Sequence, residues 1–213
     1  MTRESVVTID RTGVDALLGR IADPAALAGG GAASALTGAA AAALVAMVGG
    51  IAARHATAGS GPAEVAADAD RLRRRLTELI AVDIDTYGRV LEARRRRDAA
   101  RAAALREALV GATRAPLEIA EASLRILEHC VTLRPLARPR TVADVDVAGV
   151  LATAALEGAI VTAQANLEGL DAPAFLAETG RRLAALRERG RELRARLGQT
   201  FSDTTPGADA APR

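Results

Sequence analysis

Several residue types are scarce or missing in this sequence of 213 residues. It contains no lysine and no tryptophan, one cysteine, and three aromatic residues (Tyr87, Phe175 and Phe201). So few aromatic side chains argue against a β-sandwich, because strands favour β-branched and aromatic residues. Cys130 has no second cysteine with which to form an internal disulfide, and one cysteine with two histidines makes a poor metal set. We therefore expect a metal-free protein of the reducing cytoplasm.

The sequence also lacks a strong excess of charge of either sign. All 28 basic residues are arginine, set against 26 acidic residues, and the formal net charge is +2. The arginine clusters at 73–75, 94–97 and 181–196 have no interleaved aromatic residues on which nucleic-acid bases could stack. Such clusters are typical of solvated helix faces, so nucleic-acid binding is the weakest hypothesis and we expect no nucleic-acid partner.

Alanine is the abundant residue, with 52 copies, and it favours closely packed helices. Apolar spacing and turn residues predict six helices and no convincing strand. The predicted ranges are about 12–22, 63–96, 98–133, 142–170 and 174–197, together with a second helix that residues 29–31 open and that contains the uncharged run 35–53. The chain length suits one domain, which we expect over residues 1–198, followed by a polar, disordered tail over 199–213.

Two of these helices are almost entirely apolar. Residues 35–53 form an uncharged run of 19, close to the length that spans a bilayer, and the helix at 142–170 is nearly as apolar. Alanine and glycine dominate the first run, whereas membrane spans are richer in larger apolar residues. We therefore expect two buried central helices in an all-α multihelical bundle, and no membrane partner.

Asp83 lies on the apolar stripe of the third helix, together with Leu79, Ile80 and Tyr87. A carboxylate in a dry interior is costly, and burial raises its pKa toward the range that is useful for proton transfer. This spacing makes Asp83 a candidate general acid or base. The alternative interpretation is a structural carboxylate that accepts hydrogen bonds from an arginine or from a helix end.

The fifth helix carries polar residues in an otherwise apolar sequence. Asp144 and Asp146 fall in its first turn, where acidic residues usually cap the helix or interact with its dipole, although both could line a pocket. Asn166 lies well inside the helix, where asparagine is a mediocre helix former. It therefore needs a hydrogen-bonding partner, which could be a ligand or a facing helix.

Three consecutive glycines, Gly29, Gly30 and Gly31, open the second predicted helix. Their N–H groups could receive an anion or a carbonyl oxygen, but no strand precedes them and the known phosphate-loop patterns are absent. A turn that lets two helices touch is the simpler interpretation. His55 and Cys130 show no recognisable partner spacing and receive no role.

A series of short motifs is similar in order and spacing to that of a known family, from about Thr12 to Leu170. Residues 28–32 match a Pro-Gly-Gly-Gly-Ser loop that leads into an alanine-rich helix ending near Met-Val, here Met47-Val48. Residues 83–87 match an Asp-x-x-Ala-aromatic motif, and 112–117 match an alanine-rich segment that ends in Pro-Leu. Ala143-Asp144 and Asn166-Leu167 resemble the later Ser-Asp and Asn-Leu motifs.

The chain therefore resembles the cyclodeaminase/cyclohydrolase family, which includes formimidoyltetrahydrofolate cyclodeaminase and methenyltetrahydrofolate cyclohydrolase. This resemblance implies an all-helical homodimer that binds a tetrahydrofolate derivative as substrate, with no bound cofactor. The implied reaction is either ring closure of the formimidoyl form with release of ammonia or hydrolysis of the methenyl form. Asp83 would be the general acid/base and Asp144 would orient or share the proton.

The resemblance also suggests binding residues for the substrate. Gly29, Gly30 and Gly31 would line the pterin or one-carbon end, with Tyr87 beside them, and Asn166 would hold the pterin. The chain departs from the family pattern at Ala28, Ala32, Ala143 and Thr162. Because two hydroxyl groups are lost, the alternative is a catalytically impaired, non-enzymatic helical dimer that binds a ligand or a partner protein.

Overall fold

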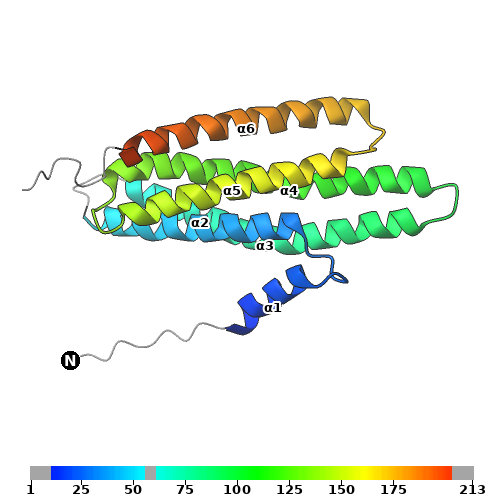
Figure 1. The fold of residues 1–213 in the computed structure, drawn as a ribbon, viewed down its shortest axis with the longest axis horizontal. Coiled ribbons are helices and arrows are strands. Elements are labelled where there is room, and N and C mark those ends of the chain that lie inside the picture. Colours follow the sequence, from blue (N-terminus) through cyan, green and yellow to red (C-terminus); the bar gives the residue numbers. More distant parts are fainter. Residues whose placement is uncertain (1–10, 56–60, 203–213) are drawn as a thin grey trace, which may run out of the picture.

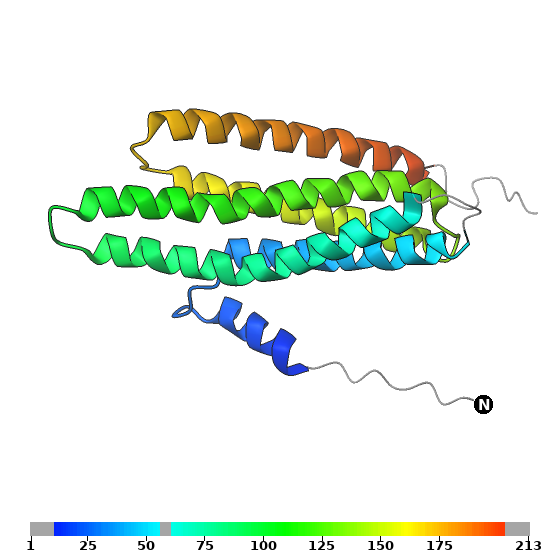
Figure 2. The same ribbon diagram turned by 180° about the vertical axis from the view of Figure 1, so that it is seen from behind.

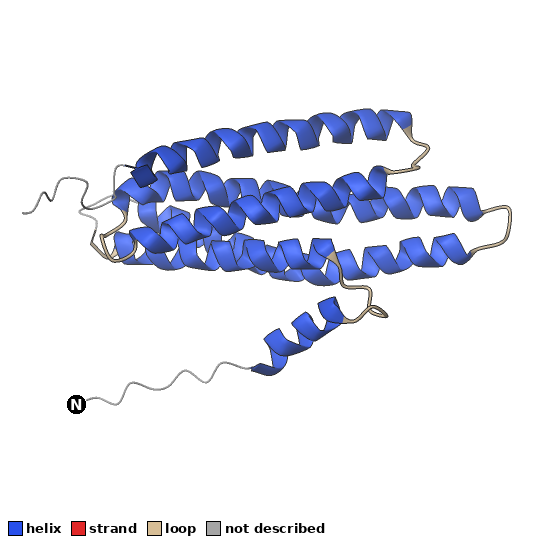
Figure 3. Cartoon of the chain, viewed as in Figure 1, coloured by secondary structure: helices blue, strands red, loops and turns tan. Residues whose placement is uncertain are grey.

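The computed structural model describes residues 11–55 and 61–202, and within them every regular element is a helix (Figures 1 and 3). These elements are α1 (Arg11–Ala22), α2 (Gly30–Ala53), α3 (Gly61–Arg95), α4 (Arg101–Leu133), the short 3-10 helix η1 (Arg134–Leu136), α5 (Val142–Leu167) and α6 (Pro173–Ser202). The all-α prediction is confirmed. Each predicted long helix exists, and its observed ends lie within a few residues of the predicted ones.

Four of the helices form a ring. Helix α2 packs on α3, α3 on α4, α4 on α5, and α5 returns to α2. Helix α6 covers the outer side of α4 and α5, and the five helices run along the long axis of the molecule (Figure 1). Helix α1 lies to one side of the ring, and a loop over residues 23–29 joins it to α2 (Figure 2). The start of α2 therefore lies where this loop meets the ring.

Small residues allow α2 to approach its neighbours closely. A Cβ atom on Gly158 of α5 would lie 2.5 Å from the Ser34 hydroxyl of α2, and one on Gly38 would lie 3.2 Å from Leu76 of α3. Larger side chains of the other helices fill the remaining core, with Leu76, Ile119 and Leu156 almost fully buried. The alanine-rich composition thus produces the short distances between helices that position the site described below.

The two apolar helices are central in the bundle, as the sequence predicts, but each buries only part of its surface within one chain. Both are long and apolar enough to cross a membrane by length and composition, yet only 50% and 44% of their most apolar stretches are buried in the fold. Met47 of α2 and Val147, Val150 and Val161 of α5 are between 44% and 61% exposed. The ring covers only the inner faces of α2 and α5, so one chain leaves an apolar strip uncovered on each.

The last helix follows its predicted leucine spacing but is longer than expected. Leu183, Leu193 and Leu197 of α6 are at most 2% exposed and contact the core of the ring. The helix continues to Ser202, so the expected tail does not begin at residue 199. The remainder of that tail, 203–213, lies outside the described residues.

Candidate active site

The glycine segment places the start of α2 against α3. Gly29 precedes the helix, and the Gly29 carbonyl accepts a hydrogen bond from the Ala33 N–H at 3.0 Å. Gly31 faces the Asp83 side chain so closely that a Cβ atom at position 31 would overlap the carboxyl group. A glycine is therefore required here by the approach of the carboxylate to the backbone. This close approach fits the interpretation of the glycine segment as a turn that lets two helices touch, and the backbone hydrogen bond to the Asp83 carboxyl comes from the next residue, Ala32.

Asp83 is a buried carboxylate with one backbone donor. Its side chain lies over the first turn of α2, and the residue is only 7% exposed. Burial raises the pKa of the Asp83 carboxyl above its ordinary value of 3.8, and a hydrogen bond from the Ala32 backbone N–H offsets this in part. None of the ion pairs among residues 11–55 and 61–202 involves Asp83. Asp83 thus accepts a bond from a helix end and still has the elevated pKa expected of an acid/base group.

A cavity of about 540 Å³ opens beside Asp83. The α1–α2 loop, the start of α2, α3, α4 and the last turns of α5 all contribute to its wall. All the predicted binding residues line it, namely Gly29, Gly30, Gly31, Tyr87 and Asn166. Tyr87 lies one helical turn after Asp83, lines the cavity and is 38% exposed.

Asn166 has the facing-helix partner that its position in α5 required. Its Nδ2 donates a hydrogen bond to the backbone carbonyl of Ala112 in α4, at 3.0 Å. The side chain also lines the cavity, so it both joins two helices and borders the ligand space. Thr162, one turn earlier on α5, lines the same cavity and donates its hydroxyl hydrogen to the Gly158 carbonyl at 2.9 Å.

Asp144 does not reach this cavity. It lies in the first turn of α5, whereas Asn166 lies in the last turn of the same helix. A helix of 26 residues is about 39 Å long, so Asp144 is at the opposite end of the bundle from Asp83. The expected pairing of Asp144 with Asp83 is therefore wrong within one chain. Its neighbour Asp146 also forms a structural contact, since it accepts a hydrogen bond from Arg134 at 2.7 Å.

The sequence did not identify several residues that line the cavity. Asp23, Pro24 and Leu27 of the α1–α2 loop border it, and Asp23 accepts a hydrogen bond from the Ala25 N–H at 2.9 Å. The Asp-Pro pair is a turn signal, and it indicates a loop that folds back next to the glycines. Ala112 and Val161 also line the cavity, but nothing distinguishes them in the sequence from other apolar helix residues.

A second cavity, of about 560 Å³, lies between α3 and α4. Arg89, Arg96 and Arg114 line it together with Glu92 and Glu107. Its wall includes Thr86 and Gly111, which are the sequence neighbours of Tyr87 and Ala112 in the wall of the Asp83 cavity, so the two cavities lie at the same level of α3 and α4. These three arginines are exposed, as predicted for a solvated helix face, and they lie around a concave surface.

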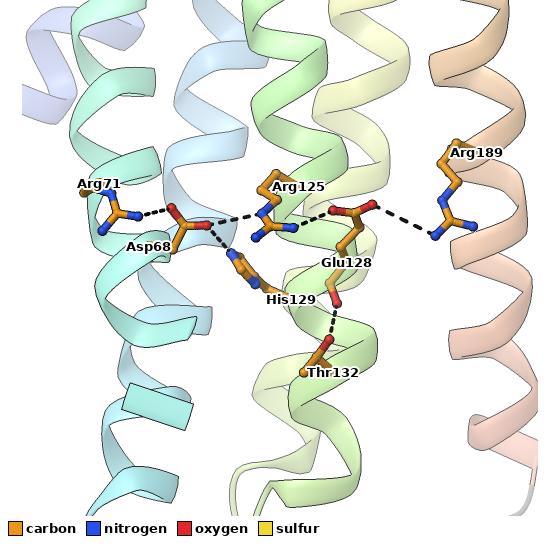
Figure 4. Close-up of polar contacts among 7 residues, drawn as sticks. All are labelled: Asp68, Arg71, Arg125, Glu128, His129, Thr132 and Arg189. Carbon is orange, nitrogen blue, oxygen red and sulfur yellow. Dashed lines mark hydrogen bonds and ion pairs between the residues drawn. The ribbon is translucent and has the colours of Figure 1, made fainter. Parts of the chain in front are cut away.

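A network of polar residues joins three helices away from the cavity (Figure 4). Asp68 of α3 bonds His129 of α4 at 2.7 Å and Arg125 at 3.2 Å, while Arg189 of α6 reaches Glu128 at 4.0 Å. Partial burial alone would raise the pKa of Asp68, but the bonds from His129 and Arg125 outweigh it and hold that pKa below 3.8. This network is structural, since its carboxylate is already committed to cationic partners.

His55 and Cys130 lie outside both cavities. His55 Nδ1 lies 2.9 Å from the Ile51 carbonyl and Nε2 lies 2.9 Å from Arg138, so both ring nitrogens have partners. Cys130 is fully buried, and burial raises the pKa of its thiol to about 12. Neither residue has the surroundings of a nucleophile. In the described part of the chain, no three His, Cys, Asp or Glu side chains are grouped as a metal site.

The fold and the site define a class of protein: a helical bundle that holds one carboxylate of raised pKa at a helix N-terminus beside a ligand-sized cavity. The family model for formiminotransferase-cyclodeaminase matches residues 13–185, and the chain belongs to this family. The resemblance found in the sequence is thereby confirmed.

Relatives of known name support this assignment. The chain is 30% identical to a methenyltetrahydrofolate cyclohydrolase of Methylorubrum extorquens over 196 residues, covering 88% of this chain and 94% of that protein. The crystal structure of formiminotetrahydrofolate cyclodeaminase from Thermotoga maritima superimposes with a TM-score of 0.80 at 18% identity, covering 94% of this chain and 97% of that one. At that identity the second match shows a common fold.

Proposed function

We propose that this protein is a folate-dependent one-carbon enzyme that hydrolyses 5,10-methenyltetrahydrofolate to 10-formyltetrahydrofolate. The observation that carries the proposal is the buried Asp83 carboxyl, which faces a cavity of suitable size and has no cationic partner among the described residues. A carboxyl group of raised pKa can both accept and return a proton near neutrality. The relative at 30% identity, named for this reaction, supports the choice of substrate.

Asp83 would act twice in this reaction. Its carboxylate accepts a proton from water as the water oxygen bonds to the carbon between N5 and N10, which gives a neutral adduct that carries a hydroxyl group. The carboxylic acid then delivers its proton to N5 as the bond between that carbon and N5 breaks. Loss of the hydroxyl proton leaves the formyl group on N10, so one proton is released overall. The Ala32 N–H holds the carboxylate in place for both steps.

The two cavities suggest how the substrate would lie. The pterin and its one-carbon bridge would occupy the cavity next to Gly29, Gly30 and Gly31, against Tyr87 and Asn166. The glutamate end of the folate is anionic, and the second cavity is lined by Arg114 and by Arg89 and Arg96, which pair with Asp85 and Asp98. Arg114→Ala should therefore raise KM more than it lowers kcat.

Ala32 and Ala143 replace the two serines of the family pattern, and neither replacement changes the lining of this cavity. Ala32 is fully buried and binds Asp83 through its backbone N–H, a contact that any residue except proline can make. Ala143 lies at the start of α5, far from the cavity. Neither alanine lines the cavity, so their side chains give no reason to prefer the non-enzymatic alternative.

Cyclodeaminase activity is the second candidate, and the name of the family favours it. Ring closure of 5-formimidoyltetrahydrofolate also needs one proton shuttle, with N10 attacking the carbon and ammonia leaving. Two assays separate the reactions. Spectrophotometric loss of the methenyl compound should be fast if the protein is a cyclohydrolase, whereas ammonia release from the formimidoyl compound should be fast if it is a cyclodeaminase. Activity in neither assay would reject the proposal.

We also propose that the uncovered strips of α2 and α5 meet those of a second copy in a homodimer, in the cytoplasm. The two strips lie on helices that pack side by side, and their exposed residues include Met47, Val147 and Val150. An apolar surface of this kind marks an interface. Met47→Glu with Val150→Glu should convert a dimer to a monomer in sedimentation equilibrium, while Glu178→Ala, on exposed α6, should not. A wild-type monomer would contradict the proposal.

A further inference from the structure

A proline inside α4 deprives one backbone carbonyl of its usual partner. In an α-helix the N–H of each residue bonds the carbonyl of the residue four positions earlier. Pro116 has no N–H, so the carbonyl of Ala112 receives no such bond, although α4 continues through the proline. Ala112 is only 2% exposed. A carbonyl left unpaired at such a position destabilises the fold, so another donor is needed.

Asn166 supplies that donor from α5. Its Nδ2 lies 3.0 Å from the Ala112 oxygen, and because a carbonyl can only accept, the contact fixes which end of the amide faces α4. The amide oxygen accepts no hydrogen bond from the described residues, and the side chain lines the Asp83 cavity. The oxygen therefore remains as an acceptor for a group in the cavity.

We propose that Pro116 is a positioning residue for ligand recognition. By removing the N–H at position 116, it directs the Ala112 carbonyl to the amide nitrogen of Asn166, which then presents its oxygen to the cavity in one orientation. Such an acceptor suits a heterocycle with ring N–H and amino donors. The identification of that heterocycle as a pterin rests on the proposed function, whereas the coupling between Pro116 and Asn166 does not.

The kinetic test uses Pro116→Ala and Asn166→Ala, singly and together. Pro116→Ala restores an N–H that competes for the Ala112 carbonyl and releases the amide. Each single variant should raise KM for the methenyl substrate about tenfold, the effect of one lost hydrogen bond, with little change in kcat. The double variant should be no worse than either single one. Pro62→Ala, at the start of α3, is the matched control and should leave KM unchanged.

A stability test separates the coupling from the activity. Asn166→Ala should lower the urea denaturation midpoint because it leaves the Ala112 carbonyl unpaired, and adding Pro116→Ala should recover most of the loss. Gln164→Ala, two residues earlier and exposed on α5, should show no such recovery.

The two tests fail in different ways. Additive midpoints, with an unchanged KM in Pro116→Ala, would overturn the inference. Absence of folate turnover in the wild type would overturn the proposed function and leave the midpoint test of the coupling intact. Recovery of the midpoint, with KM still raised in the double variant, is the result expected here.

Discussion

Asp68 and Asp83 lie on the same helix, about four turns apart, yet their surroundings shift their pKa values in opposite directions. Asp68 is the more exposed of the two and bonds His129, Arg125 and Arg71. Asp83 is buried and has a single backbone donor, Ala32. Burial disfavours the charged form of both, but only Asp68 has cationic partners that outweigh it.

The comparison separates a structural carboxylate from a reactive one. Asp68 is held in its charged form and joins helices (Figure 4), so it has no free capacity to exchange protons. Burial raises the pKa of the Asp83 carboxyl above its ordinary value, and the residue lines a cavity. Removing the Asp83 carboxylate should therefore mainly change catalysis, whereas removing the Asp68 carboxylate should mainly change stability.

The largest effect is expected from Asp83→Asn, which keeps the shape of the side chain and removes the proton exchange. The kcat for methenyltetrahydrofolate hydrolysis should fall about 10²- to 10⁴-fold, the usual contribution of a general acid/base. Asp68→Ala is the matched variant on the same helix and should keep a kcat close to that of the wild type in folded protein. A folded Asp83→Asn variant with normal kcat would remove Asp83 from the mechanism.

The second largest decrease in kcat is expected from Gly31→Ala. The added Cβ atom would overlap the Asp83 carboxyl, which must then rotate away from the Ala32 N–H. Because a catalytic group that is displaced by about 1 Å can lose about 10²-fold in rate, kcat should fall by about that factor. Gly180→Ala, on the exposed side of α6 with no atom within 4 Å of the new Cβ, should have no effect on kcat.

A smaller effect, on stability, is expected from Asp68→Ala. His129 is 5% exposed and would lose its partner, so the free energy of unfolding should fall by about 1–3 kcal/mol at neutral pH. The folded-state pKa of Asp68 lies below its ordinary value, so its stabilising contribution is present above pH 3.8 and is lost as pH falls through the folded-state pKa. Urea titrations at several pH values should show the two proteins converging in acid. A constant difference would contradict this assignment.

The smallest effect is the change in stability caused by Asp83→Asn. This variant should be more stable than the wild type at neutral pH, whereas Asp68→Ala should be less stable. The folded-state pKa of Asp83 is raised, so the wild type loses stability as pH rises from 3.8 through that pKa, whereas the amide does not. The variant should therefore unfold at a higher urea concentration than the wild type at neutral pH, with no difference below about pH 3.8. The same titrations measure this, and a variant that is less stable at neutral pH would contradict it.

The sequence predicts the helices well because their information is local. Apolar spacing and proline positions mark α3, α4 and α6, and the spacing of Asp83 with Leu79 and Tyr87 correctly places it inside. What the sequence does not predict depends on how the helices pack. The predicted fifth helix already separates Asp144 from Asn166, but nothing local indicates that Asp83 packs beside the Asn166 end, or that Asn166 compensates for Pro116. The same holds for the exposed strips of α2 and α5.

The burial of Cys130 makes its reactivity depend on opening of the bundle. This residue is the only thiol of the chain, and it is buried in the core cluster, where its pKa is about 12. A thiol reagent can therefore modify the protein only when α4 separates from its neighbours. The rate of Cys130 modification therefore measures how often the native bundle opens locally, and no label has to be introduced into the protein.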